Sequence, residues 1–220
     1  EVEGQPLGAN AARVIQALEF LGAPLAEGEV KALKAAIGKR DAAAIQKILD
    51  AHVLAAMSLN PELRVKVQRG PAKAVLRQGG FTPFLVKVIN DATVARPVRV
   101  GSPQAGAVYS GAALGILRRQ AQTELKDNEN TKGDKGRFLS VEMFGKPPMQ
   151  PNLSGLEAEY VIVLIYSHEA GKREATLQFD IGQGTQDLGF RAEVPVLFNV
   201  LPARAVRLDV RDADGAPTTA

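Results

Sequence analysis

The stretch Tyr160-Val-Ile-Val-Leu-Ile-Tyr166 is apolar along its whole length, and the rest of the chain is best interpreted around it. A run of this length is too short to cross a bilayer, which takes about 20 residues in a helix. A short run that is rich in β-branched residues and apolar on both faces indicates a strand in the middle of a sheet. We therefore expect this segment to be the central strand of a β domain.

Segments on both sides of this run alternate apolar and polar residues, which is typical of half-buried strands. Pro195 interrupts one of them and predicts an edge, a bulge or a break, because proline has no N–H to donate to a sheet. Turns rich in glycine, proline and asparagine separate the segments. Together they predict an Ig-like antiparallel β-sandwich of about seven or eight strands over residues 53–211. The alternating segments are residues 65–68, 84–89, 98–100, 175–181, 194–200 and 206–211.

Residues 1–52 follow the helical period instead, with apolar residues three and four positions apart in three short segments. We expect Asn10 to cap the first helix and Asp41 to cap the third, with Gly22 ending the first. Helices this short are unstable alone in water, so they must pack on one another or on the β domain. The chain is thus predicted to be mainly β with an α-helical N-terminal segment.

Two segments depart from the strand pattern. Residues 102–136 form a long insertion, which predicts either a functional loop or a disordered one. Residues 206–211 alternate without a fault and a turn, Asp212-Ala-Asp-Gly215, follows them. Because this hairpin has one arm and the first residue is Glu1, we expect a piece of a longer protein. Residues 212–220 would then begin a linker or a following domain.

The composition argues against several classes of function. Apolar residues make up 45% and charged residues 23% of the 220 positions, as in ordinary globular proteins. The net charge is only +3, and no lysine or arginine cluster lies among aromatic residues, which argues against nucleic-acid binding. The absence of cysteine excludes thiol nucleophiles, thiolate metal sites and disulfides, and it fits a bacterial exported protein. No segment is long and apolar enough to predict a transmembrane span.

The chain offers few residues for catalysis. Its histidines are His52 and His168, whereas a hydrolytic zinc site commonly needs two or three with a carboxylate. We expect His52 at the C-terminal end of the third helix and His168 at a solvated hairpin tip. An enzyme would need Asp180, Asp187 or Glu193 to converge with His168. No catalytic residue, metal ligand or cofactor is predicted.

The strongest local signal for a ligand is Gly182-Gln-Gly-Thr-Gln-Asp-Leu-Gly-Phe-Arg191, since its glycines permit unusual backbone angles. It lacks the strand–glycine–helix context and the Gly-Lys-Ser/Thr ending of a phosphate-binding loop. A structural interpretation has Asp187 bonding its own backbone. The ligand interpretation names Thr185, Asp187 and Arg191, with Tyr109 of the insertion as an aromatic platform. Tyr160 and Tyr166 are expected in the core.

Five blocks of the sequence, taken as a set, resemble a known family. They are Arg64-Val-Lys-Val-Gln-Arg-Gly-Pro-Ala72, Phe84-Leu-Val-Lys-Val-Ile-Asn90, Pro151-Asn-Leu-Ser-Gly-Leu-Glu-Ala-Glu-Tyr160, residues 182–191 and residues 206–220. The set resembles the N-terminal region of large exported bacterial proteins that carry a metallohydrolase domain of the CehA/McbA type, in the polymerase-and-histidinol-phosphatase superfamily. The resemblance covers roughly residues 53–220.

In that family the metal-binding residues lie in the later catalytic domain, and no stretch here matches them. The resemblance therefore implies an exported, non-catalytic module whose signal peptide has been removed. Its partners would be downstream domains of the same polypeptide or a cell-surface component, and its role would be to position or dock them. The alternative is a ligand-binding module for a glycan or cell-surface polymer, and a hydrolase in its own right is the third hypothesis.

Overall fold

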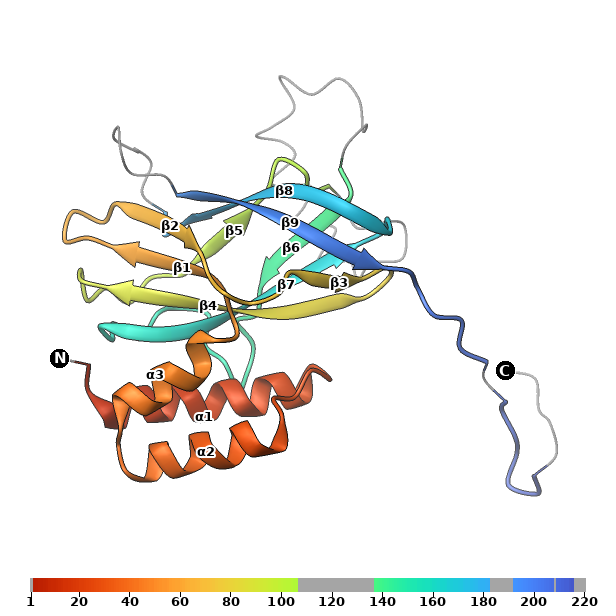
Figure 1. The fold of residues 1–220 in the computed structure, drawn as a ribbon, viewed down its shortest axis with the longest axis horizontal. Coiled ribbons are helices and arrows are strands. Elements are labelled where there is room, and N and C mark those ends of the chain that lie inside the picture. Colours follow the sequence, from red (N-terminus) through yellow and green to blue (C-terminus); the bar gives the residue numbers. More distant parts are fainter. Residues whose placement is uncertain (1, 107–136, 183–191, 208, 216–220) are drawn as a thin grey trace.

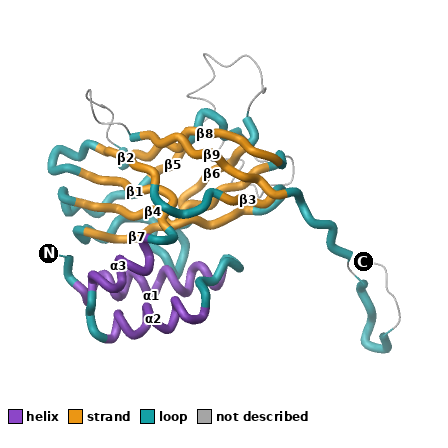
Figure 2. The backbone as a smooth tube through the Cα atoms, viewed as in Figure 1, coloured by secondary structure: helices purple, strands orange, loops and turns teal. Residues whose placement is uncertain are grey.

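The computed structural model describes residues 2–106, 137–182, 192–207 and 209–215. In these residues three helices and nine strands form three layers: a helical layer and two curled sheets (Figures 1 and 2). The helices are α1 (Gly4–Phe20), α2 (Glu27–Gly38) and α3 (Ala42–Asp50). The prediction of a mainly β protein with an α-helical N-terminal segment is confirmed.

Each sheet is named here by its strands. Sheet A has the order β2-β1-β4-β7-β6 and sheet B the order β3-β9-β8-β5. The strands of sheet A are β1 (Val53–Leu59), β2 (Val65–Arg69), β4 (Phe81–Asn90), β6 (Leu139–Met143) and β7 (Ala158–Ser167). Those of sheet B are β3 (Val75–Arg77), β5 (Arg99–Gly101), β8 (Gly171–Asp180) and β9 (Glu193–Leu201).

The apolar run at residues 160–166 lies within the inner strand β7, as predicted. It lies between β4 and β6 in sheet A and is buried on both faces. Val163 and Ile165 point into the core between the two sheets. Ile162 and Leu164 point the other way, into a second core beneath the helices. A strand that serves two cores has no polar face, which explains why its sequence does not alternate.

The expectation of an antiparallel sandwich is wrong at two pairings. Strand β1 runs parallel to β4, with Met57 opposite Val88, and β3 runs parallel to β9, with Val75 opposite Asn199. After the β1–β2 hairpin the chain crosses to sheet B as β3 and then returns beside β1 as β4. Such a crossover leaves room for parallel pairing, which a tight hairpin does not. The fold is therefore a pair of mixed sheets.

Strand β9 carries Pro195 without losing a hydrogen bond in the sheet. The N–H of Asn199 donates to Ala74 O on the β3 side of the strand, at 2.9 Å. Residue 195 is four positions from Asn199, so its backbone nitrogen faces the same side of β9. Strand β3, however, pairs only with the last three residues of β9. Pro195 thus lies where no described strand covers the edge, and the predicted edge position is confirmed.

The helices pack closely on one another and on sheet A. The first turn of α1 lies against the connection between α2 and α3, where a Cβ on Gly4 would lie 1.7 Å from Arg40 O. The Ala44 N–H donates to Asp41 Oδ1 at 2.9 Å, so Asp41 caps α3 as predicted. Gly22 follows the end of α1 at φ +71°, also as predicted. None of the described helices is long and apolar enough to cross a membrane.

Asn10 does not cap a helix, contrary to expectation. Helix α1 begins at Gly4, so Asn10 lies inside it and is buried. Its Nδ2 donates to Tyr160 O at 3.0 Å, and the Tyr160 N–H donates to Asn10 Oδ1 at 2.8 Å. The side chain that could cap a helix instead binds the backbone of the sheet.

The segment after β9 leaves both sheets and extends away from the body of the protein (Figure 1). Val206 is 78% exposed, so the half-buried strand predicted over residues 206–211 is wrong. Alternation produces a half-buried strand only where a sheet accepts it, and neither sheet does so here. The predicted turn is present, since the Gly215 N–H donates to Asp212 O at 3.0 Å.

The beginning of the predicted insertion closes one corner of the sandwich. The Gly106 N–H donates to Leu139 O and the Leu139 N–H to Gln104 O, which links the segment after β5 to β6. Residues 107–136, which make up the rest of this insertion, lie outside the described residues.

Candidate functional site

Polar side chains from the helices and from sheet A meet at the boundary between these two layers. We call Asn10, Asp50, Lys87 and Tyr160 the interlayer cluster. They come from α1, the end of α3, β4 and β7, respectively. The cluster joins residues up to 150 positions apart in the sequence.

Asp50 is the centre of the interlayer cluster. The Tyr160 hydroxyl donates to its Oδ1 at 2.7 Å, and Lys87 Nζ lies 2.8 Å from its Oδ2. Lys87 Nζ also lies 5.9 Å from the centroid of the Tyr160 ring. Burial raises the pKa of Tyr160, and the hydrogen bond and charge of Asp50 raise this pKa further. The phenol therefore stays protonated over the physiological pH range.

The interlayer cluster is suited to joining layers and poorly suited to acid–base catalysis. Both carboxylate oxygens of Asp50 are engaged, and Tyr160 is too weak an acid to transfer a proton near neutral pH. Asn10 uses its amide on the backbone of Tyr160. The polar groups of the cluster thus bond across the boundary between the two layers, and these bonds hold the helices against sheet A.

Glu159, beside this cluster in the sequence, is a second buried polar group. It is 2% exposed, and the Ser154 N–H donates to both of its oxygens, at 2.9 and 3.0 Å. Burial raises the pKa of Glu159, although the Ser154 N–H and the charge of Arg13 oppose the change. The carboxylate fixes the loop that leads into β7.

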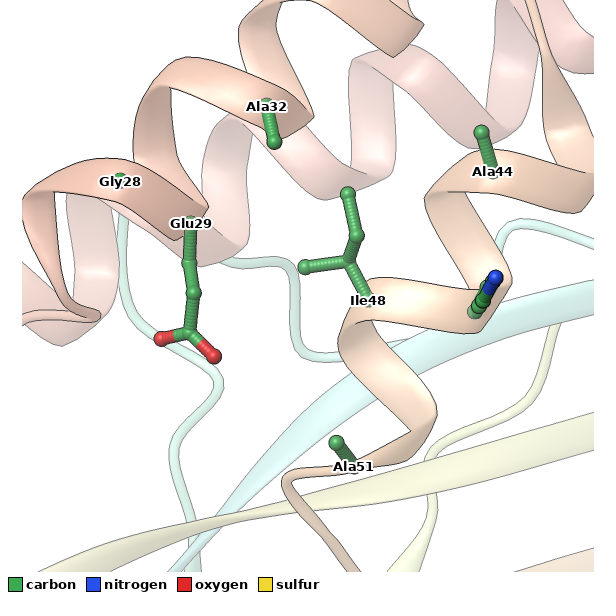
Figure 3. Close-up of a pocket in the computed structure, with 7 residues that line it drawn as sticks. Gly28, Glu29, Ala32, Ala44, Ile48 and Ala51 are labelled. Atoms are coloured by element: carbon green, nitrogen blue, oxygen red, sulfur yellow. The ribbon is translucent and has the colours of Figure 1, made fainter.

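A groove of about 490 Å³ lies between α2 and α3, where Ile48 reaches into the space between the helices (Figure 3). At its rim Glu29 Oε1 lies 2.8 Å from His52 Nε2, and Glu29 Oε2 accepts from the Ala26 N–H. The groove is open and largely apolar, so it could receive an apolar side chain but holds no catalytic set. Its lining residues are Gly28, Glu29, Ala32, Ala44, Lys47, Ile48 and Ala51.

The two histidines lie where the sequence predicts them. His52 follows the end of α3, and its N–H donates to Leu49 O at 2.9 Å. His168 lies in the hairpin between β7 and β8 with a half-exposed side chain. The contact between His52 and Glu29 was not predicted, because it joins two helices whose packing the sequence does not specify.

The described carboxylates that a hydrolase would need do not approach His168. Asp180 ends β8 and Glu193 begins β9, whereas His168 lies just before the other end of β8. At about 3.3 Å per residue, this strand separates its two ends by about 30 Å. Asp180 instead lies 3.8 Å from Arg99 of β5. In the described part of the chain, no group of three or more His, Asp or Glu residues could hold a metal ion.

The sequence predicts four candidate ligand residues. Tyr109, Thr185, Asp187 and Arg191 all lie outside the described residues. Tyr160 and Tyr166 are buried, as predicted for core residues.

Sequence reasoning missed Asp50, Lys87 and Glu159. The one available signal was a charged residue next to or within an apolar segment, as with Lys87 in the strand 84–89. That signal is equally typical of a solvated strand face, so it could not identify the cluster.

No protein-family model matches the chain, and no curated protein matches it.

Proposed function

We propose that this chain is a non-catalytic accessory module of an exported bacterial metallohydrolase and that it positions or docks the catalytic domain. The observation that carries the proposal is the segment after β9, which leaves the sandwich and exposes Val206 and Val210. A segment that leaves the body of a protein and exposes apolar side chains is what one expects where a module is joined to a neighbour. The resemblance to the region upstream of CehA/McbA-type domains supports the same role.

The distribution of polar groups in the described residues agrees with this proposal. The interlayer cluster and Glu159 join layers and fix loops, and His168 is remote from Asp180 and Glu193. We also propose that the two sheets form an Ig-like module. Two packed sheets with short edge strands resemble the sandwich modules that connect domains in extracellular proteins.

A hydrolysis assay on the purified chain tests the proposal. We expect no turnover of nitrophenyl phosphate, bis(nitrophenyl) phosphate or nitrophenyl acetate with added Zn²⁺, Mn²⁺ or Mg²⁺, and no metal-induced change in Tm. Any metal-dependent rate should be compared with those of His52→Ala and His168→Ala. A rate abolished by either substitution would contradict the proposal, because a contaminating hydrolase would not respond to it.

The alternative, a glycan-binding module, makes a different prediction. Sugars usually stack on exposed aromatic rings. In the described residues the exposed aromatic side chains are Phe20, at the end of α1, and Phe81, at the start of β4. They lie on different layers and form no row. Binding of glycans to the purified chain in an affinity electrophoresis series would nevertheless favour this alternative over the accessory module.

A further inference from the structure

The outer face of sheet B is an uncovered strand surface in the described residues. Helices cover the corresponding face of sheet A, but no described element lies over β8 and β9 (Figures 1 and 2). Alternate residues of these strands point into the core between the sheets, so the residues between them point outward. The outward residues are Lys172, Glu174, Thr176, Gln178 and Asp180 of β8, and Glu193, Pro195, Leu197, Asn199 and Leu201 of β9.

On β9 the centre of this face is apolar, whereas the paired positions on β8 are Thr176 and Glu174. Leu197 is 61% exposed, and Pro195 is the next outward residue on the same strand. Thr176 is paired with Pro195, which adds a methyl group beside them, and Glu174 is paired with Leu197. A large aliphatic side chain exposed at the middle of a sheet is a natural anchor for a contact.

The two ends of the face carry opposite charges. Lys172 is paired with Asn199 at one end. At the other end Glu193 is paired with Gln178 and Asp180 is paired with Arg99 of β5, so this end carries a net negative charge. Consider a second copy rotated by 180° about an axis that is parallel to this face and perpendicular to its strands. This rotation would place the Glu193 end of the second copy over the Lys172 end of the first. The same rotation would place Leu197 of each copy against Pro195 of the other. The face is therefore complementary to itself, as a two-fold interface requires.

We propose that the outer face of sheet B is the interface of a two-fold symmetric dimer of this chain. The sheets would pack face to face with their strands within about 30° of each other, as in β-sandwiches. Two long strands and two three-residue strands offer roughly 400 Å² of projected area per copy, from about 3.3 Å per residue and 4.8 Å between strands. Two copies together would bury about 800 Å² of projected area, which is below the range of stable specific interfaces, so the dimer is weak and reversible. The inference does not rest on the accessory-module proposal.

Sedimentation velocity of the purified chain over roughly 5 μM to 1 mM tests the dimer. We expect a concentration-dependent shift from monomer to dimer. Leu197→Asp should weaken association about 100-fold or more, because a two-fold interface places both copies of the new carboxylate in its apolar centre. Phe20→Asp is the matched control: Phe20 is also a large exposed apolar residue, but it lies at the end of α1 in the helical layer, so this variant should associate like the wild type.

A charge exchange tests the two-fold arrangement itself. Lys172→Glu should weaken self-association by placing like charges together at both ends of the interface, and Glu193→Lys should do the same. An equimolar mixture of these two variants should form a heterodimer, because the new carboxylate at position 172 of one then faces the new ammonium group at position 193 of the other. Both positions are exposed on the sheet surface, so each variant is expected to fold normally.

Three results would overturn the proposal. A chain that stays monomeric up to about 1 mM has no such interface. A dimer that Leu197→Asp leaves intact uses another surface. A mixture of the two charge variants that remains monomeric, when the wild type dimerises, contradicts the two-fold arrangement.

Discussion

The two outer faces of the sandwich differ in what lies on them, although both sheets contribute to the same inner core. The outward side of sheet A carries Leu85, Ile162 and Leu164, which three helices bury. The outward side of sheet B carries Glu174, Thr176 and Leu197, which remain accessible. The inward residues of the two sheets are alike, so they do not decide which sheet acquires a third layer. The outward residues decide it.

The comparison also shows why the helices are stable. Helix α3 has nine residues and α2 has twelve, lengths that are marginal in water. Their apolar side chains join Leu85, Tyr160 and Ile162 in one cluster. The helical layer therefore draws its stability from the outward face of sheet A, and changes on that face should matter much more than changes on sheet B.

The largest contrast is expected between Ile162→Asp and Thr176→Asp. Ile162 is fully buried beneath the helices, and an unpaired carboxylate there should cost at least about 4 kcal/mol of unfolding free energy. Thr176 points outward from sheet B, and its substitution should change this free energy by about 0.5 kcal/mol or less. Urea unfolding followed by circular dichroism measures both.

Ile162→Ala provides the same test if Ile162→Asp does not fold. It should cost about 3 kcal/mol because it leaves a cavity beneath the helices. Equal effects at positions 162 and 176 would refute the difference between the two faces.

A smaller contrast is expected between two asparagines. Asn10→Ala leaves the N–H and C=O of Tyr160 without their buried partner and should cost about 2–3 kcal/mol. Asn199→Ala removes an exposed side chain from sheet B and should have little effect. Hydrogen exchange should also show faster exchange of the Tyr160 amide in Asn10→Ala. An unchanged rate would mean that this contact does not hold α1 on the sheet.

Tyr160→Phe tests the interlayer cluster through its pH dependence. Loss of the hydrogen bond to Asp50 should cost about 1 kcal/mol near pH 7. The pKa of Tyr160 is raised above 10.0 in the folded protein, so above pH 10 the unfolded state ionises first and the wild type loses stability. The difference between the wild type and Tyr160→Phe should therefore shrink as the pH rises above 10. A difference that stays constant would contradict the raised pKa.

The smallest effect is expected from Glu159→Gln. The pKa of Glu159 is raised above 4.5, so its folded-state contribution is complete below pH 4.5 and is lost as the pH rises through the folded pKa. Glutamine keeps an acceptor for the Ser154 N–H without the buried charge. The variant should thus gain on the wild type between pH 4 and pH 7. A trend of opposite sign at Glu159 would refute the interpretation.

Strands with a regular period could be predicted from the sequence, and their direction could not. The segments 175–181 and 194–200 alternate cleanly and correspond to β8 and β9. Strand β1 contains adjacent alanines and is almost wholly buried, so its sequence shows no clean alternation. The parallel pairing of β1 with β4 depends on the route of the chain through the other sheet, and no local pattern records that route.

The polar contacts were less predictable than the strands. Asn10 and Asp41 belong to residue types that both cap helices, but only Asp41 does so. What separates them is where the helix begins: α1 begins at Gly4, before Asn10, whereas α3 begins directly after Asp41. The interlayer cluster joins residues distant in sequence, so it appears only once the layers are assembled.

The position of β9 in sheet B has a consequence for synthesis on the ribosome. The helices and all five strands of sheet A are complete by Ser167, so this part of the chain can begin to assemble while translation continues. Strand β3 has been made by Arg77, yet its partner in the sheet is the end of β9, at Asn199–Leu201. It must wait until every other described strand has been made. We expect closure of sheet B to be the late and slow step of folding, because its longest-range pairing cannot form until β9 has emerged.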